Sequence, residues 1–411
     1  MKLSLIGCTP TIDNESDPLN DMSSTIGVIV ITDSPCWTFG LMLTDCPPPF
    51  TFTRQPMDPH SLQFLKTLLD SPGPSSYETV PARAWRAEAQ GFADQVMADV
   101  SGNSFATLNP AAGPRVMLAG HIDEIGVMVT YVDDDGYLSF DTIGGWDHQV
   151  FVGQRVQLLA RSGTVAGVIG KKAIHLMDKE DREKVSKAND LWIDIGVTSR
   201  KEAETLVRIG DPGVLASAVL EFPNGRLVSR SLDNRVGAFV VLEALRLLSR
   251  NRPTARVTAA ATTREEIAYT GGGARTGAAG IEADVAIGVD VTHATDYPGV
   301  EKRKHGDYKL GGGPVITRGA AINPVVFDLL VETAEAEQIP YSIEAAPRDT
   351  STDADNIFTA LKGVATCLVS VPLRYMHSPN EMVVVEDLER TARLLAGFTA
   401  RVTATTDFVP R

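Results

Sequence analysis

The chain has 411 residues, of which 43% are hydrophobic and 22% are charged. These proportions are typical of globular protein and exclude a disordered chain or a fibre, while the length allows two or three domains. Lysine and arginine together number 38 against 52 aspartates and glutamates, which gives a net charge of −14. An acidic protein holds a polyanion poorly, so nucleic acid is not expected as a partner.

The sequence pattern favours a cytoplasmic location. The apolar runs fall far short of the ~20 residues that a membrane-spanning helix requires, so we expect no membrane partner. The N-terminus combines one lysine with a very short apolar stretch and acidic residues by Asp13, which is not the pattern of a secretory signal. The four cysteines form no CxxC pair and indicate no disulfide framework, which fits a reducing compartment.

Residues 1–56 differ in composition from the rest of the chain. They contain clusters of polar and turn-forming residues and the run Pro47-Pro48-Pro49, which no helix or inner strand would carry. We interpret them as an N-terminal appendage, either disordered or the product of a start assigned too far upstream. A helix start follows at Met57, where Asp58 can serve as the cap and Pro59 suits the first turn. We expect the folded part of the chain to begin there.

From Met57 onward, short apolar runs typical of strands alternate with amphipathic stretches typical of helices. This alternation predicts an α/β fold, in which helices cover a sheet. The expected strands include residues 115–119, 256–262, 284–289 and 364–371, and the expected helices include residues 236–249, 324–338 and 386–401. Between residues 130 and 222 the chain changes to short β-like pieces separated by glycines. We therefore predict a catalytic domain formed by residues 57–129 and 223–411, with an inserted β-rich domain at 130–222.

Histidines and acidic residues follow the ends of the expected strands. In an open α/β sheet, ligands bind at the carboxyl ends of the strands, so side chains that follow several strands meet at one edge. The residues in such positions are His121 and Asp123, the pair Glu265-Glu266, Asp290 and His377, while Asp233 lies between a strand-like run and a helix. We expect these groups to converge on one site.

Two imidazoles with several carboxylates favour a pair of zinc or similar divalent ions, which accept nitrogen and oxygen ligands together. One bridging carboxylate, with a further carboxylate and an imidazole for each ion, would satisfy such a pair. The residues that match this count are His121, Asp233, Glu266, Asp290 and His377. The same ligands accept cobalt or manganese, so the sequence leaves the identity of the metal open.

The neighbours Glu265 and Glu266 are expected to have separate roles. Adjacent side chains on an extended segment point to opposite sides, so one would bind an ion while the other handles protons. A base beside an activated water can take its proton and pass it to a leaving amine. Asp123, two residues after His121, is a candidate to fix the tautomer of that imidazole.

Several segments carry a family resemblance when they are taken in order. They are Gly120-His121-Ile122-Asp123-Glu124-Ile125-Gly126, Leu232-Asp233-Asn234-Arg235, Glu265-Glu266, Gly288-Val289-Asp290 and Arg374-Tyr375-Met376-His377-Ser378-Pro379. Their order and spacing resemble the tetrahedral, glutamyl and deblocking aminopeptidases with two metal ions, some of which carry the name cellulase or endoglucanase. The similarity extends from Met57 to about residue 399.

This resemblance implies a zinc-peptidase-like catalytic domain, in which helices flank a mixed sheet. It implies that the 130–222 insertion is a PDZ-like dimerisation domain and that the dimers assemble into a dodecamer. It also implies a general base at Glu265. The implied ligands are His121, Asp233 and Asp290 for one ion and Asp233, Glu266 and His377 for the other.

Each of these residues also has an ordinary structural interpretation. A single histidine after a strand is more often a hydrogen-bonded structural residue than a ligand, and Asp233 alone would be read as a helix cap. Their combination is what favours a metal site. Arg374 could orient the backbone of a substrate or pair with a neighbouring acid, and Asp353 is a candidate to bind a free amine.

The leading hypothesis is a metallo-aminopeptidase that removes N-terminal amino acids from short peptides. The nearest alternative is a metal-dependent hydrolase of N-acyl groups or other amides, and a further one is a non-catalytic metal-binding assembly protein. A glycosidase is disfavoured, because its two carboxylates must flank a sugar, whereas Glu265 and Glu266 are neighbours that face apart. The sequence leaves the preferred N-terminal residue open.

Overall fold

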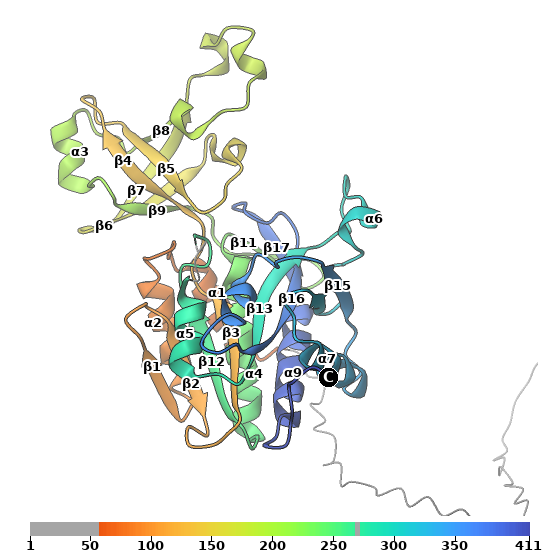
Figure 1. Ribbon diagram of the computed structural model, residues 1–411. Coiled ribbons are helices and arrows are strands. Elements are labelled where there is room, and N and C mark those ends of the chain that lie inside the picture. Colours follow the sequence, from red (N-terminus) through yellow and green to blue (C-terminus); the bar gives the residue numbers. More distant parts are fainter. Residues whose placement is uncertain (1–56, 268–271) are drawn as a thin grey trace, which may run out of the picture. The chain divides into compact units, whose positions relative to one another are not determined.

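A computed structural model describes residues 57–267 and 272–411, so the predicted appendage lies outside the described residues. Its principal element is an eight-stranded mixed sheet with the order β1-β2-β12-β3-β13-β16-β14-β15 (Figure 1). The strands of this sheet are β1 (Gln95–Ala98), β2 (Ser104–Leu108), β3 (Arg115–His121), β12 (Arg256–Thr262), β13 (Val285–His293), β14 (Val315–Gly319), β15 (Ser342–Ala346) and β16 (Ala365–Leu373). The predicted α/β fold is confirmed.

The central strands β12, β3, β13 and β16 run parallel, so their carboxyl ends meet at one edge of the sheet. Towards the sides, β2 runs antiparallel to β12 and β14 runs antiparallel to β16. The central strands are apolar on both faces, as expected for strands that helices cover on both sides. In β3, Val116 and Leu118 pack into the larger core, while Met117 and Ala119 pack into a smaller core on the opposite face.

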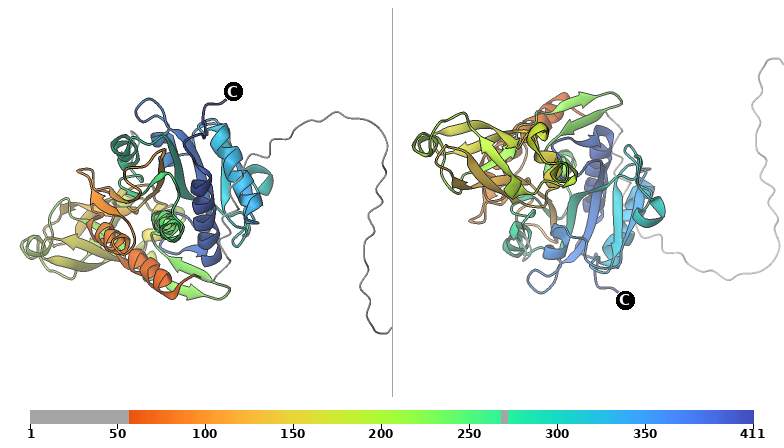
Figure 2. Two further views of the ribbon diagram at one scale, coloured as in Figure 1. Left: turned by 90° about the horizontal axis from the view of Figure 1, so that it is seen from below. Right: turned by 90° about the horizontal axis from the view of Figure 1, so that it is seen from above.

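Helices cover both faces of this sheet, as the end-on views of Figure 2 also show. The larger core lies under α1 (Pro59–Asp70), α2 (Thr79–Ala89), α4 (Leu232–Arg250), α7 (Pro324–Ala336) and α9 (Val385–Arg401). The smaller core lies under α5 (Gly272–Ile281) and α8 (Asp353–Ile357), and α6 (Lys302–His305) is a short exposed helix. Asp58 caps α1, as predicted, by accepting a hydrogen bond from the backbone N–H of His60. Within the described ranges, no helix is both long and apolar enough to cross a bilayer.

The inserted β-rich region is a closed barrel with the order β4-β5-β8-β7-β6-β9. Its strands are β4 (Gly126–Val132), β5 (Leu138–Ile143), β6 (Arg155–Ala160), β7 (Gly163–Lys171), β8 (Leu191–Asp194) and β9 (Pro212–Leu215). The same segment contains α3 (Arg200–Leu206) and the short 3-10 turns His148–Phe151, Ile174–Leu176, Asp181–Glu183 and Ala188–Asp190. The barrel has its own core, around residues such as Phe140 and Phe151. The barrel strands span residues 126–215, and the boundaries at 130 and 222 stay a prediction.

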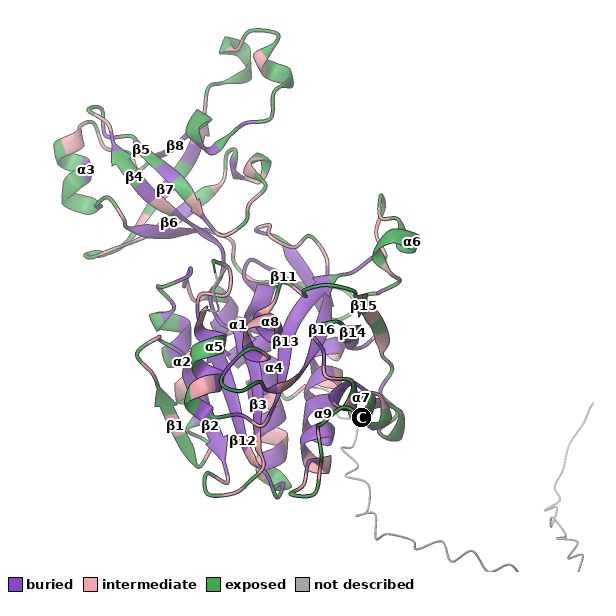
Figure 3. Ribbon diagram, in the orientation of Figure 1, coloured by how far each residue is buried: buried purple, intermediate pink, exposed green. Residues whose placement is uncertain are grey.

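A small antiparallel sheet joins two distant parts of the chain. It has the order β10-β11-β17 and consists of β10 (Leu220–Phe222), β11 (Arg226–Ser229) and β17 (Glu381–Val384). Pairing of β11 with β17 brings the segment before Asp233 next to the segment after His377. The buried strands and α4 form the interior of the domain (Figure 3). The fold therefore assembles the predicted site from segments that are far apart in sequence.

Candidate metal centre

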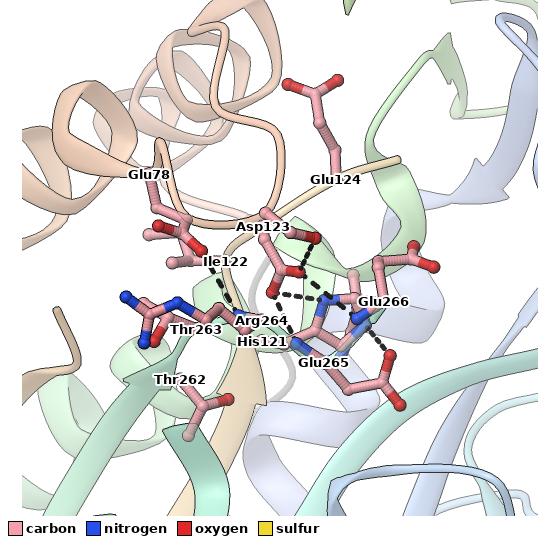
Figure 4. Close-up of polar contacts among 12 residues, drawn as sticks. Glu78, His121, Ile122, Asp123, Glu124, Thr262, Thr263, Arg264, Glu265 and Glu266 are labelled. Carbon is pink, nitrogen blue, oxygen red and sulfur yellow. Dashed lines mark hydrogen bonds and ion pairs between the residues drawn. The ribbon is translucent and has the colours of Figure 1, made fainter. Parts of the chain in front are cut away.

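His121 lies at the end of β3 and is almost fully buried, with 1% exposure. Its Nε2 lies 3.3 Å from Asp233 Oδ1, 3.7 Å from Glu265 Oε2 and 3.8 Å from Asp290 Oδ1. Figure 4 shows the imidazole between Asp123 and Glu265, which come from two different loops. Several carboxylates from different segments thus surround one imidazole, as the strand-end positions predict.

Asp233 occupies the position between the two imidazoles. It precedes the regular part of α4, with a non-helical φ of −78° and ψ of 107°. Its Oδ1 and Oδ2 lie 3.3 Å from Nε2 of His121 and of His377, respectively. The next residue, Asn234, holds this turn in place by donating a hydrogen bond of 2.7 Å to the carbonyl of Val289. A carboxylate with one oxygen towards each imidazole is suited to bridge two ions.

The end of β3 and the start of α4 approach each other at two glycines. A Cβ atom on Gly120 would lie 2.4 Å from the backbone carbon of Gly237, a separation that non-bonded carbon atoms cannot adopt. Glycine at residue 120 therefore lets β3 deliver His121 directly beside the turn that carries Asp233. This contact gives a packing reason for the glycine that precedes the histidine.

The remaining predicted ligands lie around this pair. His377 Nε2 is 3.3 Å from Glu266 Oε2, and Glu266 Oε1 is buried with no hydrogen-bond partner among the described residues. Asp290 lies within β13, which is longer than the predicted strand at 284–289. The pairing of β13 with β3 stops at Gly288, whereas its pairing with β16 continues to His293. Asp290 therefore lies beyond the last pairing with β3, beside the site.

Burial and mutual repulsion perturb the acidic groups of the site. Burial is the largest cause in each case and raises the pKa of Glu265 to about 10 and that of Glu266 to about 7, with neighbouring carboxylates adding to both shifts. The pKa of Asp290 is also raised well above its usual range, chiefly by burial. Buried carboxylates at such close range need protons or cations to offset their repulsion. This donor set, with the unpartnered oxygen of Glu266, fits divalent cations.

The pKa values of Asp233 and the imidazoles shift so as to favour the charged form of each group. Burial alone would raise the pKa of Asp233, but its hydrogen bonds with His121 and His377 hold it well below the usual range. Burial alone would lower the pKa of His377, but Asp233 and Glu266 outweigh that effect and raise it to about 11. A metal ion that binds a histidine must therefore displace a proton from it.

Two overlapping groups bring ligand atoms within 4.8 Å of one another, namely His121-Glu265-Asp290 and His121-Asp233-Glu266. His377 belongs to neither group, although it contacts Asp233 and Glu266 directly. A ligand must lie near its own ion but not near every other ligand, so these two contacts suffice to place His377 beside the other candidate ligands. The structure thus brings together all the predicted ligands and also places Glu265 among them.

Asp123 supports two parts of the site at once. Its Oδ1 lies 3.4 Å from His121 Nδ1 and accepts a hydrogen bond of 3.2 Å from the backbone N–H of Glu265. Its Oδ2 accepts hydrogen bonds of 3.3 Å from Glu266 N–H and 2.7 Å from Ser75 Oγ. The carboxylate therefore faces the imidazole and also fixes the loop that carries both glutamates, which suits its predicted role of orienting His121.

A cavity of about 780 Å³ lies beside this centre. The predicted ligands and Glu265 line one part of it, and further lining residues come from β13, β14 and β15. A cavity of this size can hold a small organic ligand or part of a peptide. The clustered acids and imidazoles are therefore accessible to a substrate.

Comparison with known proteins now identifies the family. The M42 glutamyl aminopeptidase family matches residues 102–394 of the chain. The chain belongs to this family. It is 34% identical over 336 residues to the lysyl aminopeptidase of Pyrococcus furiosus, which covers 81% of this chain and 94% of that protein.

Two solved structures of TET peptidases have a similar fold. The crystal structure of a TET aminopeptidase from a marine sediment archaeon of the Thaumarchaeota has a TM-score of 0.79 at 32% identity, covering 84% of this chain and 97% of that one. The TET1 peptidase of Pyrococcus horikoshii, described as assembling into a tetrahedron or a large octahedral shell, has a TM-score of 0.74 at 29% identity and covers 83% and 100%. The predicted family is confirmed, and this M42 chain is a peptide hydrolase. Membership implies divalent metal ions, which the clustered groups could hold.

Two residues predicted to bind substrate make other contacts in this M42 peptidase. Arg374 donates to Asp296 at 2.9 Å, and neither Arg374 nor Asp353 lines the cavity. Asp353 is buried at the start of α8, where Thr262 donates to its Oδ2. The contact with Asp296 matches the second interpretation of Arg374, in which it pairs with a neighbouring acid instead of orienting a substrate. Substrate binding by either residue stays a prediction that no contact in the structure supports.

Two buried glutamates that support the M42 site were not predicted from the sequence. Glu381, at the start of β17, accepts hydrogen bonds from the backbone N–H groups of Asp233 at 3.0 Å and His377 at 2.9 Å. Glu78 accepts from the backbone of Arg264 at 3.3 Å, and burial followed by repulsion from Asp123 raises its pKa to about 7. For Glu381, the available signal was an acid beside an apolar, strand-like run four residues after a candidate ligand.

Proposed function

We propose that this chain is a metallo-aminopeptidase that removes N-terminal amino acids from short peptides. The observation that carries the proposal is the position of Asp233, which turns one oxygen towards each imidazole, with the other acids on either side and a cavity alongside. Two divalent ions would fit this arrangement. His121, Asp233 and Asp290 would hold one, and Asp233, Glu266 and His377 the other.

The proposed chemistry divides between the ions and one side chain. When bound, the ions would polarise the scissile carbonyl and make a nearby water more acidic. Glu265 would take the proton of the attacking water and pass it to the leaving amine. Its side chain lines the cavity, and its surroundings favour the protonated form, since its pKa is raised to about 10. Nearby cations would lower that value, so the group could both accept and release a proton.

The first test combines metal analysis with a peptidase assay. The purified full chain is assayed on aminoacyl p-nitroanilides and short free peptides, before and after chelation and after addition of zinc, cobalt or manganese. We expect two ions per chain and release that stops on chelation and returns with metal. Two bound ions without hydrolysis of any of these substrates would instead favour an N-acyl or other amide hydrolase, or a non-catalytic metal-binding assembly protein.

We also propose a homo-oligomer in which the barrel forms a dimer contact and dimers build a dodecamer. Support comes from the TET1 peptidase, which is described as forming a tetrahedron or an octahedral shell, and from exposed apolar side chains in the barrel segment. Leu206 and Ile209 are 38% and 65% exposed in the single chain. Light scattering at several concentrations tests this, and a mass of one protomer throughout would contradict it. The cytoplasmic location stays a prediction.

A further inference from the structure

We propose that this site prefers peptides whose N-terminal residue has a cationic side chain, and that Glu344 and Thr317 receive the ammonium group. The inference rests on the proposed aminopeptidase function and names its substrate class. Glu344 and Thr317 line the same cavity as the candidate metal ligands, but they belong to the outer strands β15 and β14.

Glu344 is held with its side chain towards the cavity. In β15 it is half-buried, whereas its neighbours Ile343 and Ala345 are exposed, which is the alternation of a strand with one covered face. The parallel register places Glu344 directly beside Thr317 on β14. Thr292 on β13 donates a hydrogen bond of 3.3 Å from its Oγ1 to Glu344 Oε1. The carboxylate thus lines the cavity, with a hydrogen bond from Thr292 and with Thr317 at the paired position of the next strand.

The hydroxyl of Thr317 is an independent sign that a ligand belongs here. Thr317 is 1% exposed, it lines the cavity, and its Oγ1 has no hydrogen-bond partner among the described residues. A buried hydroxyl without a partner carries a desolvation cost that a ligand donor would remove. An ammonium group has three donors and no acceptor, so a carboxylate and two hydroxyls match it well.

The position of Glu344 and Thr317 relative to the metal centre suits a substrate with a long first side chain. Asp290 and Thr292 are two residues apart on β13, so they share one face of the strand at a separation of about 7 Å. A substrate whose N-terminal amine and scissile carbonyl lie at the metal centre would direct its first side chain along this face. The flexible four-carbon stem of lysine is suited to reach Glu344 from there.

The charges around the cavity also favour a cationic side chain. None of the described residues that line it is lysine or arginine. Asp349 and Asp355 also line the cavity, but Asp355 accepts hydrogen bonds from the backbone N–H groups of Thr350 and Ser351 and so mainly holds that loop. Within the described residues, the one hydrogen bond to the Glu344 side chain comes from Thr292. An acidic N-terminal side chain would meet like charge at this end of the cavity.

One competing interpretation concerns the charge of Glu344 itself. Burial raises the pKa of Glu344, and a protonated carboxyl would suit the neutral amide of glutamine better than an ammonium group. A bound cation favours the ionised form and works against this shift. A comparison of lysine and glutamine substrates therefore distinguishes an ionised Glu344 from a protonated one.

The test compares matched substrates on the metal-loaded full chain. The p-nitroanilides of lysine, arginine, norleucine, glutamine and glutamate are ranked by kcat/KM, and norleucine serves as the uncharged counterpart of lysine. We expect lysine to exceed norleucine by about 10- to 100-fold, the range for hydrogen bonds to a charged group. Glu344→Gln should remove most of that ratio. Thr317→Val should reduce the ratio by a smaller factor, and it tests the proposal independently if Glu344→Gln does not fold.

A matched control and a binding measurement complete the design. Glu332→Gln makes the same change at an exposed position on α7 and should leave the ratio unchanged. Titration calorimetry should show free L-lysine binding more tightly than L-norleucine, and Glu344→Gln should abolish the difference. Equal kcat/KM for lysine and norleucine, or a preference for glutamine or glutamate, would overturn the proposal while leaving the aminopeptidase in place. Lysine-selective binding without hydrolysis of any substrate would instead support the pocket and count against the proposed function.

Discussion

Glu265 can be tested separately from the ligands that surround it. Its backbone N–H donates to Asp123, so Glu265→Gln removes the charge of the side chain without removing the contact that holds the loop. We expect the variant to keep two ions and to lose about 100- to 10,000-fold in kcat, the usual contribution of a general base. Metal analysis and steady-state kinetics on the same sample check both points. Near-normal turnover would show that another group carries the proton.

Glu381 connects two ligand segments through backbone hydrogen bonds. It is 2% exposed, and its two oxygens accept from Asp233 and His377 separately. Glu381→Gln keeps one acceptor oxygen and Glu381→Ala keeps none. Metal affinity should therefore fall less in the glutamine variant than in the alanine variant, where we expect a loss of about 10- to 100-fold. Competitive metal titration measures this without reference to activity. Equal affinity in both variants and the parent chain would mean that other contacts position the ligands.

The sequence revealed the ligands themselves but not the residues that hold them. His121, Asp290 and His377 could be predicted because histidines and acids after several apolar runs form a recognisable pattern. Glu78 and Glu381 each accept a hydrogen bond from a backbone N–H group far away in the chain, and almost any residue type offers such a donor. The distant contacts of these supporting acids become visible only when the fold is known.

The close approach of β3 and α4 predicts the effect of a substitution at Gly120. Gly120→Ala would place a Cβ atom 2.4 Å from the Gly237 backbone, so the strand and the helix must separate. Overpacking of this kind costs about 1–3 kcal/mol, and the shift would also move His121 relative to Asp233. Chemical denaturation and metal titration should both report a loss.

A second glycine provides the control for this prediction. Gly280 lies in α5, is exposed, and has no atom within 4 Å of the place a Cβ would occupy. Gly280→Ala should therefore be neutral or stabilising by about 0.5–1 kcal/mol, because alanine favours the helix. If Gly120→Ala were as stable as Gly280→Ala, the packing reason given for the glycine before His121 would be wrong.

The elements could be predicted better than their connections. The alternation of apolar runs identified the central strands and the main helices, because burial on both faces produces a strong local signal. The closure of the barrel and the extension of β13 along β16 depend on partners distant in sequence, which local periodicity does not encode. The same holds for Glu344, whose importance follows from its register with Thr317.

The crowded acids of the site link the folding stability of the whole chain to pH. Burial raises the pKa of Glu266 to about 7 from an ordinary value of 4.5, and that of Glu265 to about 10. The folded metal-free chain therefore binds more protons than the unfolded chain above about pH 4.5. These groups favour folding at low pH, and their contribution is lost as the pH rises through the folded values. The raised pKa of His377, about 11, acts in the same direction above its ordinary value of 6.5.

Bound metal should reverse this dependence. Cations take over the role of the protons, and metal binds more tightly as the ligands lose their protons, so the loaded chain gains stability by mass action as the pH rises. We expect the melting temperature of the loaded chain to exceed that of the chelated chain, and the difference to widen from pH 5 to pH 8. Calorimetry of both forms at matched ionic strength measures it, and the subtraction removes the effect of titrating groups elsewhere. A difference that stays constant or narrows with pH would mean that the clustered acids are not the groups that metal neutralises.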